Sequence, residues 1–296
     1  MKSITFYFFI LSFVYNVGFS QNKDHSNEQL IQDSVYLIKM TDGSLFYGKI
    51  LWSNEKEIRL LTNNAGEITI QKSKIDKLEL QHGIKTKSGE YWFKNPTSTR
   101  YLISPSAFNL KAGEGYYQNI WVLFHSAHIG IADFFSLGAG FETLTLLRGQ
   151  PIFFLVPKFS FRLSDNFYAG IGGLYLNMAK STTEFGNGLG LGYGLITYGT
   201  RDDNITFGAG FDVIDGKFRT NPSFTLSGML RLSKHIGLVS ENWFFSDMDN
   251  RYYFLVSYGM RFIWESVTID LAFINNNEII NTFFLGVPFL DFVIKF

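Results

Sequence analysis

From residue 100 to the C-terminus, segments of roughly ten residues alternate between apolar side chains and small, polar or charged ones. Within residues 153–162, Phe159 and Phe161 share one parity, whereas Lys158 and Arg162 share the other. Because successive side chains of a strand point to opposite faces, each segment is expected to form a strand with one apolar, aromatic face. The alternation recurs at 136–142, 206–212 and 266–273. Strands with hydrocarbon on one side and a polar lumen on the other are typical of transmembrane β-barrels.

The turns between these segments are alternately short and long. The short breaks lie at Ala132, Ser164, Arg201, Ser233 and Trp264. The longer connections begin at Leu146, Lys180, Ile214, Ser246 and Asn275. Outer-membrane barrels have short periplasmic turns and longer external loops, so we expect the short breaks on the periplasmic side.

The pattern predicts an all-β fold, with a transmembrane antiparallel β-barrel of about twelve strands over residues 100–296. Residues 100–108 are expected to form the first, rising strand, with residues 109–115 as its outer loop. Residues 117–131 would then descend as the second strand. Ten strands remain the alternative, because Pro105 removes a hydrogen-bond donor from the first crossing.

The last strand ends at the chain terminus with alternating aromatic residues. Phe292, Ile294 and Phe296 lie on one parity, opposite Asp291 and Lys295. This ending resembles the C-terminal signal that the bacterial barrel assembly machinery reads. The stretches "SAFNLKAGEGYYQN", "LSDNFYAGIG" and "ENWFF" resemble uncharacterised outer-membrane β-barrel proteins of the Bacteroidota. These resemblances imply a barrel in contact with outer-membrane lipid, inserted by the assembly machinery.

The N-terminus has the layout of a secretory signal peptide. Lys2 precedes an apolar run, and the small residues Gly18 and Ser20 suggest cleavage after residue 20. A membrane anchor is the alternative, although the run is short for a bilayer span. Residues 21–34 form a polar lead. Residues 1–20 therefore predict export.

Residues 35–80 are much more charged than the region that follows, and turn signals divide them into about five short strands. The expected core residues are Val35, Leu37, Leu45, Ile50, Ile58, Leu60, Ile68, Ile70 and Ile75. The stretches "MTDGSLFYGKIL" and "EIRLL" resemble the first motif of Sm-like and SH3-like barrels, which implies a small five-stranded barrel. The asparagine and Arg-Gly pair with which Sm proteins bind RNA are absent, so no nucleic-acid partner is expected. Residues 81–99 are assigned as a linker.

Applying strand parity to every segment of the large barrel places ten charged side chains in its lumen. They are Glu142, Lys158, Arg162, Asp212, Arg231, Glu241, Arg261, Asp270, Asp291 and Lys295. Because paired buried ions are less costly than lone ions, this balanced set can cross-pair within a narrow or plugged barrel. The alternative is a small polar pore or ligand cavity, since twelve strands enclose more space than eight. The glycines assigned to the inward face are Gly170, Gly172, Gly188, Gly190, Gly192 and Gly194.

The stretch "LFHSAHIG" is the only candidate for catalysis, because Ser126 and His128 share a strand face. A lipid hydrolase or acyltransferase would use a serine, a histidine and an orienting polar group. Side chains two positions apart on a strand are about 7 Å apart, beyond direct hydrogen-bond reach. Aromatic residues of both parities leave the orientation of this strand open, and histidines near the membrane interface are expected as rim residues.

No cofactor or metal site is expected. The chain has no cysteine and no pair of histidines at the helical spacing of a zinc site. Asp247 and Asp249 alternate as at the start of a calcium loop, but the required glycine and distant glutamate are missing. A formal net charge of zero gives no electrostatic case for a nucleic-acid partner.

The sequence therefore predicts a non-enzymatic outer-membrane β-barrel, acting as a narrow pore or as a structural component. The small module at residues 35–80 is expected in the periplasm, where it would dock a protein partner. An outer-membrane lipid hydrolase or acyltransferase is the alternative function. A soluble secreted β-protein is a third possibility, which predicts extraction without detergent.

Overall fold

The computed structural model describes residues 35–62, 65–80, 86–87, 90–177, 188–214, 217–219, 221–246 and 251–296. The signal peptide (1–20) and the polar lead (21–34) lie outside these ranges. The chain divides into two compact units, one ending at His82 and one beginning at Gly83. Within the described ranges, no helix has both the length and the apolar character needed to cross a membrane.

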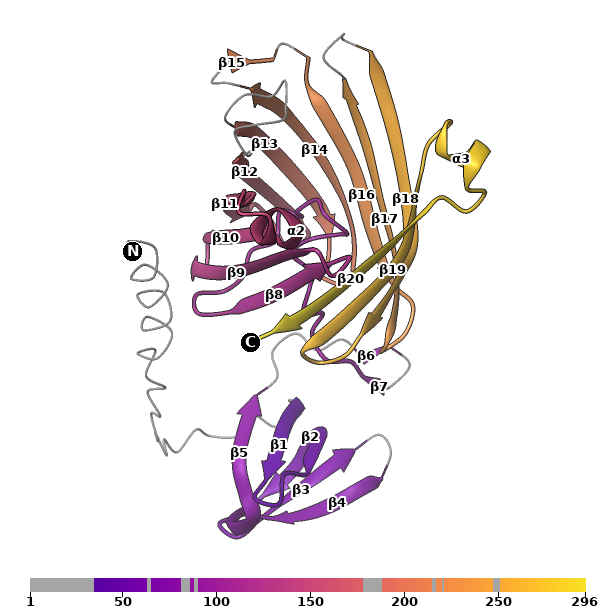
Figure 1. Ribbon diagram of the computed structural model, residues 1–296. Coiled ribbons are helices and arrows are strands. Elements are labelled where there is room, and N and C mark those ends of the chain that lie inside the picture. The colour runs from indigo at the N-terminus through magenta and orange to yellow at the C-terminus, as the bar shows by residue number, and fades with distance from the viewer. Residues whose placement is uncertain are drawn as a thin grey trace, which may run out of the picture. The chain divides into compact units, whose positions relative to one another are not determined.

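The first unit is a five-stranded antiparallel sheet (Figure 1). Its strands are β1 (Val35–Met40), β2 (Leu45–Ser53), β3 (Glu57–Thr62), β4 (Gly66–Gln71) and β5 (Ile75–Leu80). They pair in the order β4-β3-β2-β1-β5, and a short 3-10 helix, η1 (Lys72–Lys74), precedes β5. The predicted number of strands is confirmed.

The core of this unit uses the opposite face of β1 from the one predicted. Tyr36 and Ile38 are buried, whereas Val35 and Leu37 are half-buried and Leu45 is exposed. The rest of the buried core consists of Ile50, Ile58, Leu60 and Ile70. The prediction for β1 was wrong because the sequence VYLIKM is apolar at both parities, so alternation alone does not choose the buried face.

The second unit is a closed antiparallel barrel of twelve strands, which confirms the predicted fold class. Its first six strands are β8 (Gly115–Ile120), β9 (Phe124–Ala132), β10 (Phe135–Glu142), β11 (Phe153–Arg162), β12 (Phe167–Asn177) and β13 (Gly188–Gly199). The other six are β14 (Asp203–Ile214), β16 (Ser223–Arg231), β17 (Ile236–Ser246), β18 (Tyr252–Ile263), β19 (Val267–Asn275) and β20 (Val287–Lys295). Sequential neighbours pair throughout, and β20 pairs with β8 to close the barrel (Figure 1).

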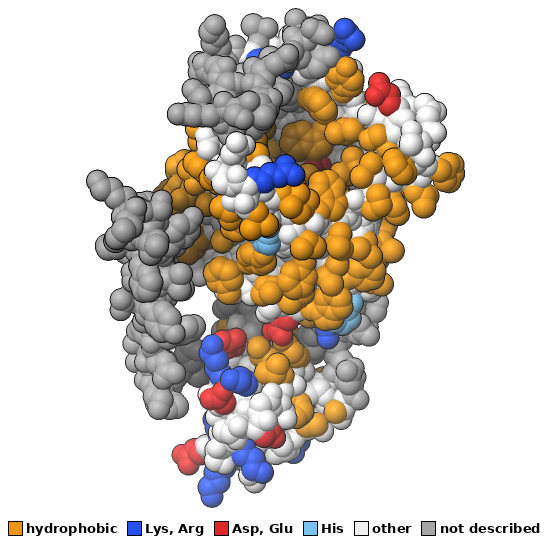
Figure 2. Space-filling model, viewed as in Figure 1, with side chains coloured by type: hydrophobic (Ala, Val, Ile, Leu, Met, Phe, Trp, Pro, Cys, Tyr) orange, Lys and Arg blue, Asp and Glu red, His pale blue; other side chains and the backbone are white. Residues whose placement is uncertain are grey.

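Hydrophobic side chains cover the outside of the barrel, as Figure 2 shows for one face. On β11, Phe153, Phe159 and Phe161 are exposed, whereas Lys158 and Ser160 are buried. The alternation in sequence therefore becomes an alternation between the outside and the lumen. An exposed apolar surface that encircles a barrel marks a membrane-facing wall rather than a soluble surface.

The turn pattern matches the prediction at one end of the barrel. Tight turns join β9–β10, β11–β12, β13–β14, β16–β17 and β18–β19, and we call this the short-turn end. At the other, long-loop end, the connections include α2 (Thr143–Leu147), β15 (Lys217–Phe218) and α3 (Ile279–Thr282). Glu142 caps α2 by accepting hydrogen bonds from the backbone N–H groups of Leu144 and Thr145.

The predicted first two crossings were wrong, although the total of twelve strands is correct. Residues 100–108 form no barrel strand, and residues 117–131 split into β8 and β9 around a tight turn. The two central residues of that turn, Trp121 and Val122, have φ values of 52° and 64°. Leu123 N–H donates to Ile120 O at 3.0 Å and closes the turn. The turn was missed because it has no glycine, asparagine or proline to signal it.

Positive φ values also make this turn a source of strain, especially at the β-branched Val122. We expect Val122→Asn to raise the free energy of unfolding by about 1 kcal/mol, because asparagine tolerates the left-handed region. Val122 is 69% exposed, so the exchange loses little apolar burial. Denaturant unfolding of the barrel in lipid vesicles measures the change, and a loss of stability would contradict the described turn.

Candidate functional site

Residues 95–110, which we call the plug segment, are packed inside the barrel instead of forming its wall. All of them are buried except Ile103, which is exposed, and Pro105, which is half-buried. The segment folds back on itself: Tyr101 N–H donates to Ser104 O at 2.9 Å, and Ser106 N–H donates to Thr99 O at 3.0 Å. The lumen therefore contains a compact loop of the protein's own chain.

The plug segment corrects two of the sequence assignments. Residues 95–99 were assigned to the linker, yet they are buried within the barrel. Residues 109–115 were assigned to an outer loop, yet Asn109 donates to the carbonyls of Ala132 and Asp133 at the β9–β10 turn. Because this turn belongs to the short-turn end, the plug segment occupies that end of the lumen.

Glu241 of β17 holds the tip of the plug segment. One of its carboxylate oxygens accepts hydrogen bonds from the backbone N–H groups of Leu102, Ile103 and Ser104, each at 2.9 Å. The other accepts from Trp243 Nε1 at 2.7 Å. Three successive N–H groups that converge on one oxygen form an anion-binding nest, so the buried charge of Glu241 is compensated by the plug backbone.

Arg261 of β18 links the wall to the plug segment. Its guanidinium makes a bidentate pair with Asp270 of β19, with both N···O distances at 2.7 Å. The same group donates to the Tyr101 carbonyl at 2.6 Å and to the Thr97 carbonyl at 3.2 Å. A fully buried guanidinium thus uses its planar fork for one carboxylate and its remaining donors for the plug backbone.

The plug segment also supplies a buried charge of its own. Arg100 pairs with Asp291 of β20 at 2.5 Å and lies 3.7 Å from Asp270. Its guanidinium donates to the carbonyls of Tyr101 and Leu102 as well. The sequence reasoning missed Arg100 because it assigned residues 100–108 to a wall strand. The signal was present in Pro105, which argued against a paired strand at that position.

Two further cations bind plug carbonyls. Lys158 of β11 donates to the carbonyls of Phe108, Ser106 and Thr99 at 2.6, 3.0 and 3.3 Å, so its three donors are all used. Arg201, in the β13–β14 turn, donates to Ser98 Oγ at 2.8 Å and to Asn109 O at 3.0 Å. Both side chains satisfy carbonyls that the loop cannot pair internally.

Arg231 ends β16 at the short-turn end of the barrel, where it contacts Trp92 and Phe93, which precede the plug segment in sequence. It is fully buried, pairs with Asp202 at 2.9 Å and donates to the Phe93 carbonyl at 2.7 Å. The rings of Trp92 and Phe93 lie 5.2 and 4.9 Å from its guanidinium carbon. These cation–π contacts fix the approach to the plug segment.

The other predicted lumen charges take no part in holding the plug segment. Glu142 caps α2, Arg162 is exposed and pairs with Asp165 at 2.6 Å, and Asp212 is half-buried near the long-loop end. Lys295 pairs with Glu114 at 3.1 Å. Burial opposes ionisation of Glu114, but the Lys111 N–H and the Lys295 ammonium hold its pKa below the ordinary value.

The residues of the predicted C-terminal signal lie at the seam that closes the barrel. Ile294 is exposed on the outside and Phe292 is half-buried. Phe296 and Gly115 exchange two backbone hydrogen bonds, each at 2.9 Å. A Cβ on Gly115 would meet the Phe296 ring at 2.5 Å, so only glycine lets the terminal ring lie across β8.

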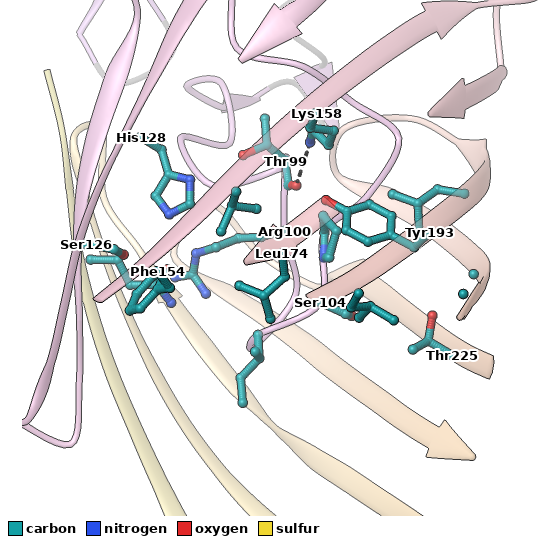
Figure 3. A pocket seen from close by; sticks show the side chains of 18 of the residues that line it. Thr99, Arg100, Ser104, Ser126, His128, Phe154, Lys158, Leu174, Tyr193 and Thr225 are labelled. Carbon is teal, nitrogen blue, oxygen red and sulfur yellow. Dashed lines mark hydrogen bonds between the residues drawn. The ribbon is translucent and has the colours of Figure 1, made fainter. Parts of the chain in front are cut away.

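A cavity of about 380 Å³ borders the plug segment (Figure 3), and Trp121 and Phe124 at the β8–β9 turn line it toward the long-loop end of the barrel. Its floor includes Thr99, Arg100 and Ser104 of the plug segment. Its wall is largely apolar and includes Phe154, Val156, Leu174, Leu176, Leu191, Leu195 and Trp243. Among the described residues that line it, none is an aspartate or a glutamate.

Ser126 and His128 both face this cavity from β9 (Figure 3). His128 is therefore not the rim residue that was predicted. Its ring stacks on Tyr116 at 4.6 Å, and a Cβ on Gly138 would collide with it. The described contacts include no hydrogen bond between Ser126 and His128, so the geometry shows no activated nucleophile.

The inward glycines were predicted correctly on β12 but not on β13. A Cβ on Gly170 would approach Ala107 of the plug segment, and one on Gly172 would meet the Tyr193 hydroxyl. On β13, however, Leu191, Tyr193 and Leu195 line the cavity. The glycines that alternate with them therefore lie on the outer face of β13: Gly188, Gly190, Gly192 and Gly194. The prediction was wrong because it treated glycine as a small inward residue, and LGLGYGLIT alternates glycine with leucine.

No group of three or more metal-ligating side chains occurs within the part of the chain that the structure describes. Asp247 and Asp249 lie outside that part. The predicted lumen charges that converge on the plug segment instead bind its backbone or one another. The arrangement is one of internal neutralisation rather than of a cation site.

The chain matches no protein-family model and no curated protein. Among solved structures, it resembles the NanC porin at 8% identity and a TM-score of 0.39, covering 62% of this chain and 97% of that one. It resembles the KdgM porin at 10% identity and 0.43, covering 62% and 96%. It also resembles Salmonella typhi OmpF in complex with daunomycin, at 8% identity and 0.30, covering 89% and 96%. At such low identity and overlap, the similarity assigns neither a family nor an activity.

Thiol labelling can test whether the hydrogen bonds to Glu241 restrain the plug segment, because the sequence has no cysteine of its own. Ser104→Cys places a thiol at a buried position of the plug segment. Glu241→Ala removes the acceptor of three N–H groups and should favour opening by about 2 kcal/mol. The maleimide labelling rate of the thiol should therefore rise roughly 30-fold.

The matched control is Glu265→Ala, which removes an exposed carboxylate in the β18–β19 turn. It should leave the labelling rate within about twofold of the parent. Equal labelling of the thiol with and without Glu241 would show that this carboxylate does not restrain the plug segment.

Proposed function

We propose that the protein is a non-enzymatic outer-membrane β-barrel whose lumen is closed at the periplasmic end by its own plug segment. The observation that carries the proposal is the set of buried charges of the wall that bind the backbone of residues 95–110. Glu241, Arg261 and Lys158 come from three different wall strands and all bind backbone groups of the plug. Specific hydrogen bonds thus hold the loop in the lumen, as expected for a segment that closes the barrel.

The outer-membrane location is supported by the wall of the barrel. Its outward face carries exposed phenylalanine, leucine and isoleucine side chains on every side of a closed sheet, which removes the free edges that lipid would not tolerate. The short-turn end is proposed to face the periplasm, as in other barrels of this kind. The module at residues 35–80 would then lie in the periplasm.

The periplasmic module is proposed to dock a protein partner. Residues 81–94 connect β5 to the plug segment in sequence. A pulling force on the module would therefore be transmitted to the plug segment along the covalent backbone. A partner that binds the module would thereby influence whether the lumen stays closed. The barrel would act as a narrow, gated pore, or as a closed anchor that holds this module at the membrane.

The lipid hydrolase or acyltransferase remains the alternative. Ser126 and His128 share the cavity, which is the one observation in its favour. A mass change in vesicle lipid, lost in Ser126→Ala, would support it. Stable lipid over the same period, with the barrel folded, would exclude it under those conditions.

The closed lumen gives a direct electrical expectation. The full chain should show no steady conductance in planar lipid bilayers, because the plug segment fills the short-turn end. The double variant Glu241→Ala with Arg261→Ala should conduct in bursts, since it removes two of the wall groups that bind the plug backbone. Arg162→Ala, at an exposed site, serves as the control and should stay silent.

Heat-modifiable gel migration shows whether each variant still forms a barrel. If the double variant keeps this migration and stays as silent as the parent, the wall charges do not hold the lumen closed. An open parent channel would contradict the proposed closure itself.

The C-terminal residue provides a separate prediction on assembly. Phe296→Ser should reduce the amount of barrel assembled in cells severalfold, while refolding into vesicles is less affected, since the backbone bonds to Gly115 remain. Phe283→Ser, in a loop at the other end, is the control. Equal cellular yields of the two variants would show that the terminal ring is not read during assembly.

A further inference from the structure

The half of the lumen above the plug segment is apolar, which is unusual for a barrel of this kind. Porin interiors are polar because water fills them. Here Leu174 and Leu176 of β12 and Leu191 and Leu195 of β13 face inward, although each adds an apolar group to the lumen. Such side chains are costly against water and favourable against hydrocarbon.

We propose that this cavity binds a neutral molecule made mostly of hydrocarbon, with one hydroxyl or carbonyl group. Its volume of about 380 Å³ lies in the lower part of the range for small-molecule sites. At ~30 Å³ for each non-hydrogen atom, this space accommodates roughly a dozen such atoms. The inference holds whether or not the plug segment gates a pore, because it rests on the cavity wall.

The ligand is inferred to be neutral from the charges that surround the cavity. The described lining includes no carboxylate, so it offers no anionic group to neutralise a cation. Lys158 and Arg100 reach the lining, but Lys158 spends its three donors on plug carbonyls and Arg100 is neutralised by Asp291 and Asp270. An anionic group would lose its hydration without gaining a free cation.

The single polar group is inferred from Tyr193. Its hydroxyl is buried and has no hydrogen-bond partner among the described residues. The side chain lines the cavity from β13, and its hydroxyl lies over Gly172 of β12 (Figure 3). Leaving a buried hydroxyl unpaired is unfavourable, so a ligand hydroxyl or carbonyl that bonds to it would gain affinity and orientation.

Two sources could supply this chemistry, a free solute and the acyl chain of a membrane lipid. The probes are therefore bromododecanol, a neutral brominated alcohol, and a phosphatidylcholine brominated on its acyl chains. Bromine quenches nearby tryptophan, and Trp243 lines the cavity. The full chain, with Trp52, Trp92, Trp121 and Trp264 replaced by phenylalanine so that Trp243 is the one remaining tryptophan, is reconstituted in detergent-free vesicles.

The expected result is saturable quenching by at least one probe. Quenching by bromododecanol identifies a free solute, and quenching by the brominated lipid identifies an acyl chain from the bilayer. Leu174→Phe with Leu191→Phe fills the cavity and should abolish the saturable component. Ile171→Phe places the same bulk on the outer face of β12 and should leave it unchanged.

Tyr193→Phe tests the polar contact without filling the cavity. The parent should bind bromododecanol about fivefold more tightly than bromododecane, and the variant should bind both equally. The proposal is overturned if neither probe gives saturable quenching, or if the filled variant is quenched as strongly as the parent. Equal affinity of the parent for the alcohol and the alkane would overturn the inferred role of Tyr193.

Discussion

The rest of this structure depends on one requirement: a peptide loop inside a barrel must have its backbone groups satisfied by the wall. Backbone hydrogen bonds within residues 95–110 pair only some of the loop's N–H and C=O groups, so the others need partners from outside the loop. Glu241 accepts from three of the N–H groups, while Arg261 and Lys158 donate to the carbonyls. The buried charges of the wall are thus explained by the loop, because its backbone groups are their hydrogen-bond partners.

This requirement divides the lumen into two halves with different chemistry. At the short-turn end, ionic side chains bind the plug segment and one another, and the density of buried charge is high. Toward the long-loop end, β11, β12 and β13 turn leucine, valine and phenylalanine inward around a cavity. The polar lumen that is typical of outer-membrane barrels accounts for the charged short-turn end, but not for the apolar cavity. The apolar half favours an occupant less polar than water.

The alternation of residues predicted the barrel well, because period-two patterning reports directly which side of a wall each residue faces. It predicted Glu241, Arg261 and Asp270 as inward charges, but not what they bind. The plug segment was misread as a strand because a short alternating stretch looks alike in a wall or a loop, and only Pro105 argued otherwise. The turn at Trp121 was missed since tertiary contacts, including the bond from Trp121 Nε1 to Pro288 O at 2.9 Å, hold it in place of a local signal.

A pair of cysteines tests whether the plug segment lies within the lumen. The side-chain oxygens of Ser104 and Ser227 are 3.0 Å apart, one on the plug segment and one on β16. In the variant with cysteine at both positions, a disulfide should form under mild oxidation, seen as an altered migration of the unfolded chain that reduction reverses. A pair that stays reduced in the folded, oxidised barrel would contradict an occupied lumen.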